Sequence, residues 1–130
     1  MSYSNQAAAY RARQIQTASP ARLVVLVYEA ALANLLRARR AVETGNVEDR
    51  VTSVGKARDA IMELLVTLNT DEGGEVAKNL KALYAFILSE LVDVARRNDG
   101  ARLETVIRMV TELHSAFDAL ASDPAKAPAA

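Results

Sequence analysis

Few side chains in this sequence are of the types that perform chemistry. The chain has no cysteine and one histidine, His114, so a nucleophile activated by a histidine base can be built only around that residue. A carboxylate-bridged pair of metal ions in a helical bundle needs Glu-x-x-His on facing helices, whereas Thr111 stands three positions before His114. We therefore predict no metal site, no cofactor and no enzymatic activity, and interpret His114 as a structural histidine. The competing hypothesis is an enzyme with an unusual site, built from a serine with a lysine or from two carboxylates.

The glycine pair Gly73 and Gly74 is a second place where chemistry could occur, because it precedes a predicted helix. Free amides at a helix start can bind an anion. Neither a Walker sequence nor a dinucleotide-binding fingerprint surrounds the two glycines, so we favour a plain turn between two helices.

Composition and charge narrow the class of protein further. With 130 residues and 51% hydrophobic residues, the chain is expected to form one domain with a single core. The 16 basic and 16 acidic side chains cancel, which argues against nucleic acid as a partner. The longest apolar run, from Leu23 to Tyr28, is far shorter than the roughly 20 residues of a membrane-spanning helix, so we expect no membrane insertion. The absence of cysteine and of an apolar leader is compatible with the cytoplasm.

The spacing of apolar residues predicts four helices. Apolar side chains recur every three or four positions between residues 19 and 120, which is the helical period. Ser19 can cap the first helix, and Pro20 suits its first position. The first helix is expected to end near Gly45. The other three are predicted over 48–68, 75–97 and 101–120.

Short connections between these helices force neighbours to run antiparallel. We therefore predict an all-α fold, an antiparallel up-down-up-down four-helix bundle over residues 19–120. A flexible N-terminal arm is expected at 1–18 and a disordered tail, rich in alanine and proline, at 121–130.

Each predicted helix carries one apolar stripe that we expect to face the core. Arg58 falls within the stripe of the second helix, and we interpret it as an arginine whose head reaches water from the core edge. The predicted core residues are, helix by helix, Val24, Val25, Tyr28, Ala31, Leu32, Leu35, Leu36, Ala38 and Val42; Val51, Val54, Ile61, Leu65 and Leu68; Val76, Leu80, Leu83, Tyr84, Ile87, Leu91 and Val94; and Leu103, Val106, Val110, Leu113, Phe117 and Leu120.

Several apolar residues remain once this core is filled. Leu26 falls among charged residues on the outer side of the first helix, and apolar residues flank it. Contiguous apolar surface usually marks a partner site, and it suits an amphipathic helix from another chain. The N-terminal arm could fold over this surface or contact the partner itself. The candidate partner-binding residues are Tyr10, Ile15, Leu23, Leu26, Val27, Ala30 and Phe86.

Two segments of the chain resemble the FliS family of flagellar secretion chaperones. The run AYRARQIQTASPARLVVLVYEAALANLLRA, residues 9–38, is similar to the opening of that family, in which a T-A-S-P helix start is followed by a leucine-tyrosine pair. The run GGEVAKNLKALYAFI, residues 73–87, resembles the segment that opens the family's third helix. The sequence departs from the family at Val27, where leucine is expected, and before Tyr10, where Asn-Pro-Tyr is missing.

The resemblance implies a function that the periodicity alone does not. It implies a cytoplasmic export chaperone that binds the disordered C-terminal segment of flagellin, prevents premature polymerisation and assists flagellar type III export, with the export gate as a further partner. We expect a monomer or a weak homodimer. The alternative is a structural oligomerisation bundle without a flagellin client, because heptad stripes alone do not distinguish the two.

Overall fold

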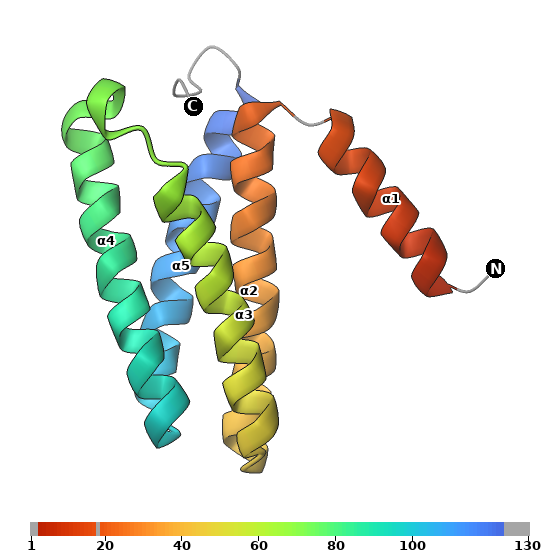
Figure 1. Cartoon of the computed structure of the whole chain (residues 1–130), viewed down its shortest axis with the longest axis vertical. Helices are drawn as coiled ribbons and strands as arrows, with labels where there is room; N and C mark the ends of the chain where they lie inside the picture. The colour runs from red at the N-terminus through yellow and green to blue at the C-terminus, as the bar shows by residue number, and fades with distance from the viewer. Residues whose placement is uncertain (1–2, 18, 124–130) are drawn as a thin grey trace.

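The computed structural model describes residues 3–17 and 19–123, and its regular elements there are all helices (Figure 1). The all-α prediction is confirmed, with five helices in place of the four expected. The helices are α1 (Tyr3–Thr17), α2 (Pro20–Thr44), α3 (Val47–Val66), α4 (Thr70–Arg97) and α5 (Gly100–Ser122).

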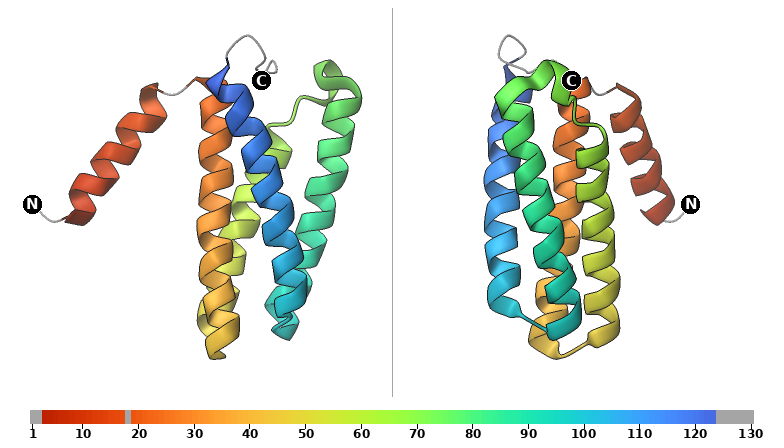
Figure 2. Two further views of the ribbon diagram at one scale, coloured as in Figure 1. Left: turned by 180° about the vertical axis from the view of Figure 1, so that it is seen from behind. Right: turned by 60° about the vertical axis from the view of Figure 1, so that its left-hand side comes forward.

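Helices α2 to α5 lie side by side, each antiparallel to the next along the chain (Figures 1 and 2). Helix α2 packs against α3 and α5, and α4 packs against the same two helices. Helices α2 and α4 therefore lie across the bundle from each other, as Figure 2 shows.

Local capping explains where the bundle helices begin and end. The Ser19 side chain accepts a hydrogen bond from the Arg22 amide at 3.2 Å, and Pro20 occupies the first turn of α2, as predicted. Gly45 ends α2 in the left-handed conformation, with φ 70°. The side chains of Asn46, Asn69 and Asp99 cap the starts of α3, α4 and α5.

Two tyrosines meet at the centre of the core. The hydroxyls of Tyr28 on α2 and Tyr84 on α4 form a hydrogen bond across the bundle, and both rings are buried. The ring of Phe117 on α5 lies 5.3 Å from that of Tyr28, measured between centroids. Burial raises the pKa of both tyrosines, because a phenolate away from water is strongly disfavoured.

The core of α3 differs from the predicted stripe. Val51 and Arg58 are exposed, whereas Arg50 and Ser53 are buried. Val54 and Ile61 are buried as predicted, but Ala57 and Ala60 share their face, and residues this small did not stand out in the apolar pattern. Val76 and Leu83 on α4 and Leu36 on α2 were also predicted in the core and are exposed.

The N-terminal arm contains a helix that the sequence analysis did not predict. Helix α1 follows from the alanine-rich stretch around residues 7–9 and the arginines and glutamines after it, which favour helix. It projects away from the bundle in both figures. Whether the arm is flexible stays a prediction, and most of the predicted tail lies outside the described residues.

Candidate partner-binding surface

The predicted residues of α2 share one exposed face near the start of the bundle. Leu23 and Ala30 are exposed, and Leu26 is half-buried. Val27 is half-buried and packs against the core, so it contributes less to the surface than predicted. We call Leu23, Leu26 and Ala30 the α2 patch.

The two predicted residues of the arm lie on α1. Tyr10 is 65% exposed. The backbone of Ile15 is helical, but its side chain lies outside the described residues. Only residues 18 and 19 separate α1 from α2, so the arm is attached at the end of α2 that carries the α2 patch.

Phe86 does not join the α2 patch, because it belongs to α4 on the other side of the bundle. It is 47% exposed, as predicted for a residue outside the core. The structure therefore divides the predicted site between two surfaces.

The surroundings of Phe86 follow from the ion pairs that join α4 to α5. Arg102 of α5 binds Glu90 at 2.9 Å and Asp93 at 3.2 Å, so these two carboxylates mark the edge of α4 that faces α5. Leu83 and Phe86 stand seven residues, or about two turns, before Glu90 and Asp93. They consequently lie on the same edge, and Leu83 is 36% exposed.

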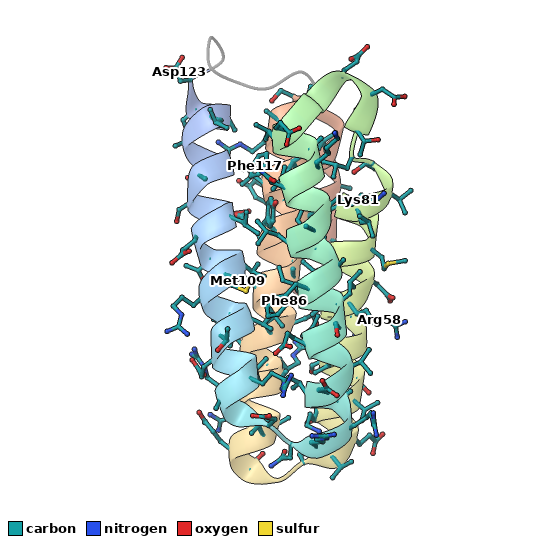
Figure 3. All side chains as sticks on the ribbon, turned by 90° about the vertical axis from the view of Figure 1, so that its left-hand side faces the viewer. Arg58, Lys81, Phe86, Met109, Phe117 and Asp123 are labelled. Atoms are coloured by element: carbon teal, nitrogen blue, oxygen red, sulfur yellow. The ribbon has the colours of Figure 1, made fainter. Side chains whose placement is uncertain are left out.

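The facing edge of α5 is apolar at this level. Met109 stands seven residues after Arg102 and lies on the same side of α5. Met109 and Phe117 are half-buried, and Figure 3 shows both along the boundary with α4, with Met109 beside Phe86 and Phe117 closer to the end of the bundle where α4 begins. We call the following residues the α4–α5 strip: Val76, Leu80, Leu83, Phe86, Met109, Leu113 and Phe117.

Sequence reasoning missed most of this strip because the heptad pattern assigned it to the core. The residues of the strip recur with the same spacing as core residues. However, within the described residues, ion pairs join α4 to α5 only near the C-terminal end of α4. The sequence does carry one signal of this exposure. Glu90 and Asp93 stand one heptad after Leu83 and Phe86, whereas a buried stripe would have apolar residues at those two positions.

Polar contacts hold the C-terminal end of α4. The buried Arg50 of α3 donates hydrogen bonds to the Ala95 carbonyl at 3.0 and 3.3 Å and to Asn98 Oδ1 at 2.9 Å. Arg102 also donates to Asp99, and the backbone and side-chain hydrogen bonds from Arg102 lower the pKa of that carboxyl.

The opposite end of α4 is shaped by two glycines. Gly74 has φ 57° and ψ −136°, a conformation open almost only to glycine, and it interrupts α4. A Cβ on Gly73 would lie 2.5 Å from Ala77 Cβ. The glycine pair therefore kinks α4 one turn after its start, whereas the sequence analysis expected it in the connection between two helices.

The boundary between α2 and α5 is crossed by polar pairs instead. Arg22 binds Asp118 at 2.9 Å and Arg39 binds Glu104 at 2.6 Å. His114 Nε2 lies 3.2 Å from Glu29 Oε2 and so joins α5 to α2.

Among the described residues no three His, Cys, Asp or Glu side chains are grouped as metal ligands would be. None of the described helices is both long and apolar enough to span a membrane.

Comparison with known proteins gives one consistent result. The family model described as flagellar protein FliS matches residues 3–124. A flagellar secretion chaperone FliS of Vibrio cholerae is 33% identical over 105 residues, covering 81% of this chain and 77% of the relative. The flagellar secretion chaperone FliSB of Pseudomonas aeruginosa is 33% identical, covering 82% of this chain and 85% of the relative. The FliS chaperone of Bacillus subtilis is 29% identical over 90% of this chain and 86% of its own length.

Proposed function

This chain belongs to the FliS family of flagellar secretion chaperones, which is not a family of enzymes, and we propose that its client is the disordered C-terminal segment of flagellin. Binding would keep that segment from polymerising in the cytoplasm and would deliver it for flagellar type III export. The export gate is the further partner that this role requires.

The observation that carries the proposal is the exposed apolar surface on both sides of the bundle. Val76, Leu83 and Phe86 are 67%, 36% and 47% exposed along the α4–α5 strip. Exposed apolar side chains gathered on one surface usually mark a partner site. Two apolar surfaces on opposite sides of one bundle suit a long segment that wraps around it.

The energetics of such binding explain why the surface is apolar. A disordered segment loses conformational entropy when it folds onto its chaperone, which costs several kcal/mol. Buried apolar anchors supply the compensating free energy, while charges set the register and the encounter rate. The surface is not enclosed, so the client can leave again when export begins.

The N-terminal arm belongs to the same proposal in one of two roles. Tyr10 and Ile15 either contact the client or cover the apolar surface until the client displaces them. A tethered segment acts at a high effective concentration, so even weak contacts would suffice for covering.

Calorimetric titration with a peptide of flagellin's C-terminal segment tests the client assignment. Phe86→Asp and Leu26→Asp should each weaken binding at least tenfold, because each places a charge in an apolar contact. The matched control is Leu36→Asp, an exposed leucine on α2 outside both surfaces, which should bind within about twofold of wild type. Normal binding by Leu26→Asp would remove the α2 patch from the site, and normal binding by Phe86→Asp would remove the α4–α5 strip.

The oligomerisation alternative predicts a different result in light scattering. If a second copy covered the apolar surface, the protein would be a stable dimer whether or not the flagellin peptide was present. The proposal expects a monomer or weak homodimer that forms a defined complex with the peptide.

A further inference from the structure

The outer edge shared by α3 and α4 carries mainly apolar and basic side chains. Of its basic residues, Lys78 pairs with Glu75 at 3.6 Å. Its residues recur at spacings of three and four along each helix, so each set lies on one face. We call this surface the α3–α4 strip. It consists of Val47, Val51, Gly55, Arg58, Met62 and Val66 on α3 and of Lys78, Lys81, Ala85, Leu88, Val92 and Arg96 on α4.

The two halves of the strip adjoin each other. Helices α3 and α4 are packed together and antiparallel. Arg50 binds the Ala95 carbonyl, so Val51 lies at the level of Val92 and Arg96. Figure 3 shows Arg58 and Lys81 on the same outer side of the bundle, away from the α4–α5 strip.

The side chains of the strip are available to a partner. Met62 and Val92 are each 42% exposed. Arg58, Lys81 and Arg96 make neither an ion pair nor a side-chain hydrogen bond within the described residues. The strip is unlike the α2–α5 boundary, where Arg22 and Arg39 of α2 are matched by carboxylates of α5.

We propose that the α3–α4 strip is a second docking surface, distinct from the flagellin site, and that it binds an acidic amphipathic helix of a partner protein. Valine and methionine side chains would bury the apolar face of such a helix, and the three unpaired cations would pair with its carboxylates. The chain as a whole has a formal charge of +0, so this basic character is local to the strip.

The spacing of the cations argues against other occupants. Arg58 and Lys81 are interleaved with exposed valine and methionine, which the phosphate backbone of a nucleic acid would leave unburied. A second copy of this chain would have to present an acidic apolar face.

A designed peptide provides the test. The probe is a helix of about 18 residues with leucine on one face and glutamate elsewhere, and the control peptide replaces every glutamate by lysine. We expect the full-length protein to bind the acidic peptide and not the basic one, with affinity falling as salt rises. In nitrogen-15 spectra the perturbed amides should belong to the outer edges of α3 and α4.

Charge-reversal variants sharpen the test. Arg58→Glu with Lys81→Glu should weaken binding of the acidic peptide at least tenfold. Arg37→Glu with Arg40→Glu reverses two exposed arginines on α2 and should bind within about twofold of wild type. Circular dichroism would check that both double variants are folded.

Several outcomes would overturn the proposal. The proposal fails if the acidic peptide does not bind, or if the basic peptide binds equally well. It also fails if the amide shifts lie on the α4–α5 strip, or if the Arg58→Glu/Lys81→Glu variant binds the acidic peptide as tightly as wild type. A homodimer that Met62→Glu dissociates would assign the strip to a second copy, and binding only to anionic vesicles or nucleic acid would also refute it. Titrating the same variants with the flagellin peptide keeps the two surfaces separate, since neither result depends on the other.

Discussion

At the scale of single residues, the buried tyrosine pair is the most informative contact. Tyr28 and Tyr84 join helices that lie across the bundle from each other, and each supplies the hydrogen-bond partner of the other hydroxyl. Removing one hydroxyl therefore leaves the other buried without this partner.

We expect Tyr84→Phe to lower the free energy of unfolding by about 1–3 kcal/mol, because the Tyr28 hydroxyl loses its partner. The double variant Tyr28→Phe/Tyr84→Phe should recover part of that loss, since neither hydroxyl then remains buried. Urea unfolding of both single variants and the double variant measures the difference. A double variant that loses the sum of the single effects would contradict this account.

The same pair makes stability depend on alkaline pH. Burial raises the pKa of both tyrosines in the folded state, so the unfolded chain releases these protons first as pH rises. The contribution of the two tyrosines to the free energy of unfolding is complete below the pKa of tyrosine in the unfolded chain. It declines above pH about 10. Urea midpoints should fall between pH 9 and 11 on this basis, and less steeply in the double phenylalanine variant. An equal fall in both proteins would show that other groups cause it.

At the scale of the helices, several capped ends were predicted better than the buried faces, although α4 begins at Thr70 and not near residue 75. Caps and glycines such as Ser19 and Gly45 act locally, so the sequence revealed them. Which face of α3 is buried depends on how the neighbouring helices pack against it. Small residues and Arg50 are buried there, while Val51 is exposed at the edge. The α4–α5 strip was missed for the same reason, since a heptad stripe does not reveal how closely a facing helix approaches.

The turn into α4 gives a prediction at this scale. Gly74→Ala should lower the free energy of unfolding by about 1–3 kcal/mol, because alanine is strained at φ 57° and ψ −136°. Gly55→Ala is the matched control: Gly55 lies inside α3 with open space around its Cβ position, so alanine should raise stability by about 0.5–1 kcal/mol. Thermal or urea unfolding distinguishes the two. Equal effects at both glycines would refute the backbone explanation.

At the scale of the whole molecule, the two proposed roles of the N-terminal arm lead to opposite effects of removing it. Helix α1 projects from the bundle, and the helix pairs that pack in the described residues are formed by α2 to α5. Deleting residues 1–16 distinguishes the two proposed roles. If the arm covers the apolar surface, binding of a hydrophobic dye should rise and flagellin affinity should rise or stay level.

If Tyr10 and Ile15 contact the client instead, the deletion should weaken flagellin binding while dye fluorescence stays unchanged. A Tyr10→Ala variant of the full chain is the matched control, because it removes a contact but keeps the tether. Weakened binding with flat fluorescence in both proteins would exclude the covering role.

The uneven attachment of α4 has a consequence for how the client could be released. Arg50 and Arg102 hold its C-terminal end, whereas glycine and exposed apolar residues stand at its N-terminal end. Amide hydrogens in the first turns of α4 should therefore exchange with solvent through local opening, and those near Ala95 only through global unfolding. If the first turns of α4 separate from α5 while the rest of the bundle stays folded, the client can dissociate. Such local opening costs much less free energy than global unfolding.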